Sequence, residues 1–208
     1  MVFRALMRPN FRSLLALAAL ACAAALAGCA TPPSKAPAPY YVKAYKPNNP
    51  ANVRVAVSLR NQAVYVMEGD RPLMAAACTV GKPSSPTPKG TWTIYSKQKH
   101  RRKFTNPGKG YPMGYWCEFK SAYGIHAGWV HPQPRSQGCI RLHFNAAPKF
   151  FELVREGTKV HIADTQPQDA TIGSDLARPQ DYNNPEFPPE ILNTNRIFSV
   201  YQGPIFES

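Results

Sequence analysis

The sequence predicts a mainly β protein with one principal helix. Short segments such as Val53–Leu59 alternate apolar and polar residues, and this period of two is typical of half-buried strands. The chain contains 22 prolines, about twice the average usage, and proline breaks helix interiors. Only one stretch, from Asn145 to about Glu156, places apolar side chains on a helical face next to recognisable end signals.

The predicted elements follow one another between short turns rich in glycine, asparagine and aspartate. The strands are expected at Val53–Leu59, Ala63–Met67, Leu73–Val80, Gly90–Tyr95, Tyr115–Phe119, Tyr123–His126 and Thr158–Ile162. Asn145 is the expected helix N-cap, Pro148 is tolerated in the first turn, and Gly157 suits the helix end. The stretch Gly81–Pro88 has three prolines and two serines and is expected to be a loop.

Size and composition favour one folded domain with extensions. The 208 residues are 44% hydrophobic, which supplies enough apolar side chains for a core and excludes wholesale disorder. Five cysteines are too few for a disulfide-built miniprotein. Cys78 and Cys117 lie on predicted strands and are expected to be separate core thiols, with a disulfide as the alternative if the chain is exported to an oxidising compartment. The basic run Lys97–Lys103 is expected to be a solvated loop.

The N-terminus has the pattern of an export signal. A basic start, Met1–Arg12, precedes the short uncharged run Leu14–Gly28, which is too short to cross a bilayer comfortably. The run ends in Leu26-Ala27-Gly28-Cys29, which resembles the bacterial lipobox and implies lipidation of Cys29 after removal of residues 1–28. Ala30 resembles an outer-membrane sorting signal. An ordinary secretory signal or an uncleaved anchor remains the alternative.

The rest of the chain changes character twice. Residues 29–52 contain six prolines and no apolar period, so we expect a Pro-rich tether, followed by the folded domain at 53–163. Residues 164–208 carry seven acidic residues against two arginines. A solvated, partly disordered extension is the preferred interpretation, and folding back over the basic domain is the alternative.

The formal net charge of +13 indicates that the binding partners are anionic. An exported protein does not meet the chromosome, so no nucleic-acid partner is expected. The charge instead favours anionic envelope polymers or phospholipid headgroups. No compact metal-ligand spacing is present, so neither a metal nor another cofactor is expected.

A cysteine and a histidine stand out as candidates for chemistry. A Cys139 nucleophile would need its thiolate, and His126 could take the proton near neutral pH. Gly138 would let substrate approach the backbone, and positive charge at Arg141 would favour the thiolate. Taken alone this is a weak signal, because inert buried cysteines are common.

The surrounding motifs add a family resemblance. His126, nine intervening residues and then Ser136-Gln137-Gly138-Cys139-Ile140-Arg141-Leu142 resemble the active-site motif of the L,D-transpeptidase family, in which His, a spacer and Ser/Thr-His-Gly-Cys occur in this order. Upstream, Gly81-Lys82-Pro83 and Thr87-Pro88-Lys89-Gly90 resemble the family's Gly-x-Pro and Thr-Pro-x-Gly stretches. The resemblance covers about Val53–Ala163. One departure is Gln137, which stands where the family usually has histidine.

The resemblance implies a fold, a reaction and roles for named residues. The fold would be a β-sandwich of two packed mixed sheets with one principal helix. Cys139 would attack a peptidoglycan tetrapeptide stem, with His126 as base and the N–H groups of Gly138 and Cys139 holding the oxyanion. The Ala127 carbonyl would orient the imidazole, and Ser136 would steady the loop. Carbapenems, which acylate the family's cysteine, are expected to acylate Cys139.

Three further residues are candidates for substrate binding. Arg141 could meet a substrate carboxylate or simply hold the loop, and Tyr115 and Trp116 could belong to a lid or to the core. The expected activity is a cysteine acyltransferase that forms 3→3 cross-links or attaches a protein amine to peptidoglycan. The alternatives are a hydrolase that uses water as acceptor and an impaired module that only binds peptidoglycan. The expected location is the periplasm or cell envelope, where a lipid would anchor the protein to a membrane, the outer membrane by the sorting resemblance above. An envelope protein is one candidate acyl acceptor.

Overall fold

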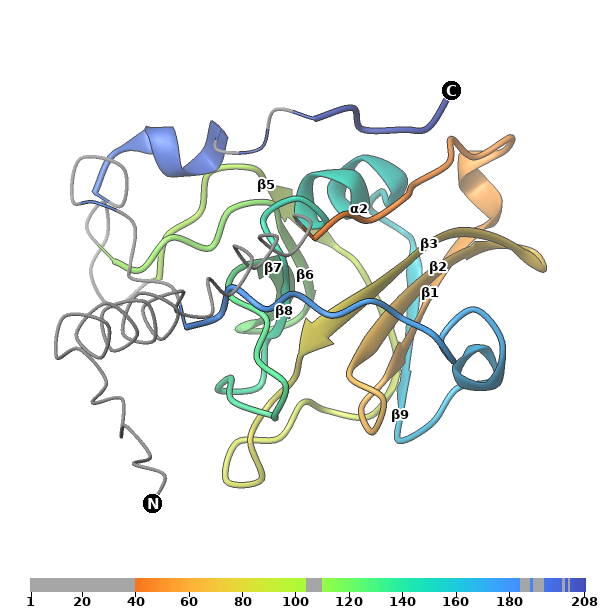
Figure 1. Ribbon diagram of the computed structural model, residues 1–208, viewed down its shortest axis with the longest axis horizontal. Helices are drawn as coiled ribbons and strands as arrows, with labels where there is room; N and C mark the ends of the chain where they lie inside the picture. Colours follow the sequence, from red (N-terminus) through yellow and green to blue (C-terminus); the bar gives the residue numbers. More distant parts are fainter. Residues whose placement is uncertain (1–39, 104–109, 184–187, 189–192, 200, 202) are drawn as a thin grey trace, which may run out of the picture. The chain divides into compact units, whose positions relative to one another are not determined.

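The computed structural model describes residues 40–103, 110–183, 188, 193–199, 201 and 203–208, and its main feature is a mixed β-sheet (Figure 1). The strands are β1 (Val53–Ser58), β2 (Ala63–Glu68), β3 (Arg71–Thr79), β4 (Gly90–Thr93), β5 (Ser96–Gln98), β6 (Trp116–Lys120), β7 (Tyr123–Ala127), β8 (Ile140–Leu142) and β9 (Lys159–Ala163). The α-helix within this part of the chain is α2 (Ala147–Leu153). Short 3₁₀ helices occupy Pro50–Asn52, Pro167–Ala170 and Asn195–Ser199.

The strands follow one hydrogen-bonded order, β4-β9-β1-β2-β3-β8-β7-β6-β5. Strand β3 joins the two halves, because its first part pairs with β2 whereas Cys78 and Thr79 pair with β8. The pairs β1–β9 and β7–β8 are parallel and the others are antiparallel. Strands β4 and β6, from opposite halves, are in contact, so the sheet curls. The mainly β class is confirmed, and the two expected sheets are the halves of this one curled sheet.

The half that contains β6, β7 and β8 has one apolar face and one polar face. Cys117, Ile125, Ile140 and Leu142 point into the core and are fully buried. Since strand side chains alternate between faces, the residues between them point the other way. The polar face thus receives Glu118, Gly124, His126 and Arg141. The burial of the first set fixes the register that displays the second set.

Two short strands and the helix ends differ from the expectation. β5 and β8 have three residues each, too few to show a period of two. The helix begins at Ala147, and Asn145 is not its side-chain cap, because the Asn145 amide donates to the Tyr40 carbonyl instead. At the other end, the Lys97 ammonium donates to the carbonyls of Phe151 and Val154, both at 2.6 Å. Lys97 thus satisfies carbonyls that the helix leaves open.

The second half of the predicted tether packs on the domain. Val42 and Ala44 are buried, and Ala44 forms a β-bridge with Met74. The fully buried Lys149 of α2 donates to the Val42 carbonyl at 2.7 Å. The expectation of a free tether up to residue 52 is therefore wrong from Tyr40 onward. The export signal, Cys29 and the start of the tether lie outside the described residues.

The described part of the C-terminal extension also packs on the domain, which corrects the preferred solvated interpretation. Asp169 accepts hydrogen bonds from the hydroxyls of Ser58 (2.8 Å) and Tyr65 (2.7 Å). Ile197 and Phe198 are buried, and the Phe198 ring stacks on His100 at 5.0 Å. No helix among the described residues is long and apolar enough to span a bilayer.

Candidate active site

His126 and Cys139 lie on the same face of two neighbouring parallel strands. β7 and β8 pair with Ile125 opposite Ile140 and His126 opposite Arg141. Cys139 immediately precedes β8, so the continued register places it two residues from His126 along the same face. Neighbouring strands lie about 4.8 Å apart and two residues span about 6.6 Å along a strand, so side chains with this diagonal offset start about 8 Å apart and can approach each other. The sheet therefore brings together the two residues that the motif indicated.

The imidazole of His126 is buried and is oriented by the backbone. Its Nδ1 lies 2.7 Å from the carbonyl oxygen of Ala127. Because a carbonyl only accepts hydrogen bonds, Nδ1 carries a proton, and in the neutral ring Nε2 keeps its lone pair. The ring packs against the Trp116 indole, with centroids 5.7 Å apart. His126 is thus held in the tautomer that can accept a proton at Nε2, and Ala127 makes the contact that the resemblance implied.

Hydrogen bonds brace the loop before Cys139 from two sides. Ser136 Oγ donates to the Cys139 carbonyl at 2.5 Å and accepts from the Gly138 N–H at 3.0 Å. Thr87 Oγ1 donates to the Gly138 carbonyl at 2.9 Å, and the Ser136 N–H donates to the Val80 carbonyl at 3.0 Å. Ser136 therefore supports the loop. The Gly138 N–H is already engaged, which contradicts the expectation that it is free for an oxyanion.

Burial sets the protonation state of the pair. It raises the pKa of the Cys139 thiol, against a backbone hydrogen bond from Gly124 and the positive charges of Arg141 and Arg101. It lowers the pKa of His126 to about 4, with the Ala127 hydrogen bond opposing and the same two arginines adding to the effect. At neutral pH the resting pair is therefore a neutral thiol beside a neutral imidazole.

Cys139 differs from the other described cysteines in its access to solvent. Its side chain is partly exposed, and Sγ lies 3.7 Å from the carbonyl oxygen of Ala122, in the turn between β6 and β7. Cys78 and Cys117 are free and fully buried, which confirms that they are separate core thiols. Burial also raises the pKa of both. Among the described cysteines, Cys139 is therefore the one placed to act as a nucleophile.

The candidate substrate-binding residues lie in different settings. Arg141 is partly exposed on the same face as the pair, with its aliphatic stem against Gly128. Trp116 is 1% exposed, and Tyr115 is half-buried, with its hydroxyl donating to the Phe198 carbonyl at 2.9 Å. Gln137 is exposed. Direct contact of Tyr115 or Trp116 with substrate stays a prediction.

Three polar residues, Thr87, Glu118 and Arg101, have positions that sequence reasoning did not assign. The Thr87 hydroxyl donates to the Gly138 carbonyl. Thr87 belongs to the Thr-Pro motif, so the motif marks this residue although it does not indicate its partner. Glu118 accepts hydrogen bonds from Trp116 and from the N–H of Ala122, both at 3.1 Å. Arg101, from the run expected to be solvated, stacks on Trp116 with its guanidinium carbon 4.5 Å from the ring centroid. No sequence pattern indicated these two roles.

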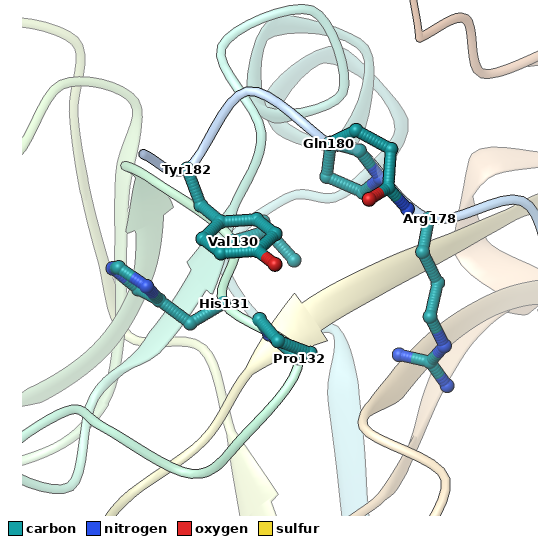
Figure 2. Close-up of a pocket in the computed structure, with 7 residues that line it drawn as sticks. Val130, His131, Pro132, Arg178, Gln180 and Tyr182 are labelled. Carbon is teal, nitrogen blue, oxygen red and sulfur yellow. The ribbon is translucent and has the colours of Figure 1, made fainter. Parts of the chain in front are cut away.

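A small cavity of about 50 Å³ lies between the segments around residues 131 and 180 (Figure 2). Its lining residues are Val130, His131, Pro132, Arg178, Pro179, Gln180 and Tyr182. Neither Cys139 nor His126 belongs to this lining, so the cavity is separate from the candidate pair. Among the described residues, no group of three or more His, Cys, Asp or Glu side chains could hold a metal ion.

Comparison with known proteins gives a consistent result. Residues 52–162 match the model of the YkuD family, described as an L,D-transpeptidase catalytic domain. A curated Bacillus licheniformis protein named as an L,D-transpeptidase YkuD is 35% identical over 115 residues. The match covers 52% of this chain and 64% of that relative, so the chain spans somewhat less than two thirds of the relative's length.

A solved structure supports the fold. The L,D-transpeptidase structure from Stackebrandtia nassauensis superposes with a TM-score of 0.50 and 22% identity, covering 60% of each chain. At this identity the likeness bears on the fold alone. The match of the family model over more than half of the residues carries the assignment: the chain belongs to the family of L,D-transpeptidase catalytic domains.

Proposed function

We propose that the protein is an L,D-transpeptidase that acts on peptidoglycan stems through a Cys139 thioester. The observation that carries the proposal is the register of β7 and β8, which places His126 and Cys139, the residue just before β8, on one face, with Nε2 of the imidazole left as an acceptor. Family membership supports acyl transfer in peptidoglycan as the reaction class.

The first half-reaction would release the terminal D-alanine. His126 Nε2 takes the Cys139 proton as Sγ attacks the carbonyl carbon of the third stem residue. The oxyanion would be held by the Cys139 N–H, because the Gly138 N–H is bonded to Ser136. The C–N bond then breaks, the imidazolium gives its proton to the departing amine, and a thioester remains.

The second half-reaction would transfer the acyl group. The side-chain amine of another stem attacks the thioester, His126 takes the amine proton, and the C–S bond breaks. The thiolate that leaves recovers its proton from the imidazolium. Arg141 would meet a substrate carboxylate, since it lies opposite His126 in the strand pairing and is partly exposed. A protein amine in the envelope would fit the same step.

The neutral resting pair makes the proton transfer part of the attack. A preformed thiolate–imidazolium pair is opposed by burial of both groups, which raises the pKa of Cys139 and lowers that of His126. Arg101 and Arg141 favour the thiolate but oppose the imidazolium. Substrate binding would therefore have to align the carbonyl before Cys139 ionises.

The proposed location is the cell envelope. An exported chain with a lipid on Cys29 would stand at a membrane through its proline-rich tether, within reach of the peptidoglycan. This part of the proposal comes from the N-terminal sequence pattern. Growth with radiolabelled palmitate should label wild-type protein but not Cys29→Ser, and equal labelling of both would remove the anchor from the proposal.

Product analysis tests the reaction. The full chain is incubated with a purified disaccharide-tetrapeptide, and the products are separated and weighed by mass spectrometry. We expect a cross-linked dimer and free D-alanine with wild-type protein and neither with Cys139→Ala. Tripeptide monomer without dimer would mean that water is the acyl acceptor and that the enzyme is a hydrolase. Unchanged substrate with the wild-type protein would contradict both.

A further inference from the structure

The carboxylate of Glu118 lies on the polar face and contacts residues that in turn contact His126 and Cys139. It is on β6, directly opposite Gly124 of β7, and its side chain is 13% exposed. Its two oxygens accept hydrogen bonds at 3.1 Å from the Trp116 indole and from the N–H of Ala122, and the Tyr95 hydroxyl also bonds to the carboxylate. The Arg101 guanidinium lies 3.7 Å away. One partly exposed acid thus connects several elements of the site.

The first connection leads to the general base. Because Trp116 Nε1 donates to Glu118, the indole has a fixed orientation across the strand pair. A Cβ on Gly124 would lie 2.7 Å from this indole, so the ring lies directly over Gly124. The same indole packs against the His126 imidazole, while Arg101 stacks on the indole. The position of the imidazole therefore depends on the indole that Glu118 holds.

The second connection leads to the nucleophile. Ala122 has φ +64°, a conformation that non-glycine residues rarely adopt, in the tight turn between β6 and β7. The hydrogen bond from its N–H to Glu118 holds this turn. The carbonyl of the same residue lies 3.7 Å from Cys139 Sγ. Glu118 therefore also fixes the backbone against which the sulfur rests.

We propose that Glu118 is a positioning residue for the Cys139–His126 pair, acting on His126 through Trp116 and on Cys139 through the Ala122 turn. The inference rests on the proposed function, because it assigns the pair a reaction that needs alignment. Alignment to within fractions of an ångström is what such catalysis requires.

The charge of Glu118 acts in the opposite direction to its geometry. A negative charge near the sulfur raises the pKa of Cys139 and so disfavours the thiolate. Removing the charge while keeping the shape should therefore make the thiol more acidic and yet make the enzyme slower. This opposition distinguishes a positioning role from an electrostatic one.

The test compares Glu118→Gln, Trp116→Phe and the wild type as full-length chains. Glu118→Gln keeps the shape but can accept properly from only one of the two N–H donors, and Trp116→Phe keeps a ring but removes the indole N–H. The first readout is the rate at which a carbapenem acylates Cys139, followed by intact mass. The second is the pH dependence of iodoacetamide alkylation, read on the Cys139 peptide. Alkylation needs the thiolate but no alignment with His126.

We expect acylation to fall about tenfold or more in Glu118→Gln and by less in Trp116→Phe. The alkylation midpoint of Cys139 in Glu118→Gln should lie at or below the wild-type pH. Glu156→Gln, which changes an exposed acid, is the matched control and should behave as wild type. Protection of the buried Cys78 and Cys117 from alkylation shows that each variant is folded.

Acylation within twofold of wild type in the folded variants would overturn the proposal, and so would an alkylation midpoint that moves to higher pH. If Glu118→Gln does not fold, Trp116→Phe decides alone. The test is separable from that of the function. Slower acylation in the variants, with no product from tetrapeptide in the wild type, would uphold the positioning role and refute the transpeptidase. Normal product formation in the wild type and in the variants alike would support the transpeptidase and refute the positioning role of Glu118.

Discussion

Acidification should destabilise this protein through the buried His126. The imidazole is 4% exposed, and burial lowers its pKa in the folded state to about 4, against about 6.5 for an unfolded chain. Between these two values the unfolded chain binds a proton that the folded chain refuses. Stability is therefore fully present above about pH 6.5 and is lost progressively as the pH falls towards 4.

The size of this effect follows from the two pKa values. A difference of about 2.5 units, at 1.36 kcal/mol per unit, corresponds to about 3 kcal/mol of unfolding free energy between pH 7.5 and pH 4. This is a large part of the stability of an ordinary domain, which is about 5–15 kcal/mol. Other groups titrate in the same range, so the contribution of His126 has to be isolated by substitution.

The assay is urea denaturation at a series of pH values for the wild type and His126→Asn. Asparagine keeps a polar group near the Ala127 carbonyl but does not titrate. The wild type should lose about 3 kcal/mol more than the variant between pH 7.5 and pH 4. Parallel stability curves for the two proteins would refute the reasoning, because they would mean that the imidazole takes up its proton equally well in the folded state.

Three further changes probe the loop and the C-terminal segment. Thr87→Val should destabilise by about 1–3 kcal/mol in urea denaturation, because it leaves the Gly138 carbonyl and the Gly81 N–H without their hydroxyl partner; no change in midpoint would contradict this. Gly138→Ala should abolish carbapenem acylation in a folded protein, because φ is +107° and the added Cβ would lie 2.5 Å from the Tyr123 ring; wild-type acylation would show that the loop adapts. Phe198→Ala should destabilise the protein by about 3–5 kcal/mol and expose the C-terminal segment to protease, whereas unchanged cleavage would mean that the segment is not docked.

Local patterns predicted most of the sheet. The strands from β1 to β3 and β9 have clear alternation or continuous apolar runs, so they were found to within a few residues. β8 could not be found in this way, because Ile140-Arg141-Leu142 is too short to show a period. The helix cap was mispredicted at Asn145, because that amide finds the Tyr40 carbonyl, a partner 105 positions away in the sequence.

The residues of the candidate site also fall into two groups: those that a local motif indicates and those whose contacts depend on the tertiary structure. Cys139, His126 and Ser136 came from motifs whose order along the chain was informative. The contacts of Glu118 depend on the register of β6 against β7, which no short pattern encodes. The basic run Lys97–Lys103 was expected to be solvated because the partners of its side chains lie far away in the sequence. Lys97, for example, finds its partners at the end of α2, more than 50 residues further along the chain.

The acidic extension shows why composition alone misleads. Its charge and prolines are typical of solvated chain. Yet Asp169 has its hydroxyl partners on Ser58 and Tyr65, and Glu207 accepts from the Tyr41 hydroxyl at 2.6 Å. Each acid is placed by a donor that comes from a distant part of the chain. Such pairings become visible only once the sheet has formed.

Rapid-quench mass spectrometry of the full chain, mixed with a tetrapeptide donor in the absence of an acceptor amine, tests the central claim most directly. The account predicts an adduct on Cys139 equal in mass to the donor less D-alanine, formed more slowly in His126→Asn and absent in Cys139→Ala. An adduct on another residue, or D-alanine released by Cys139→Ala at the wild-type rate, would contradict it.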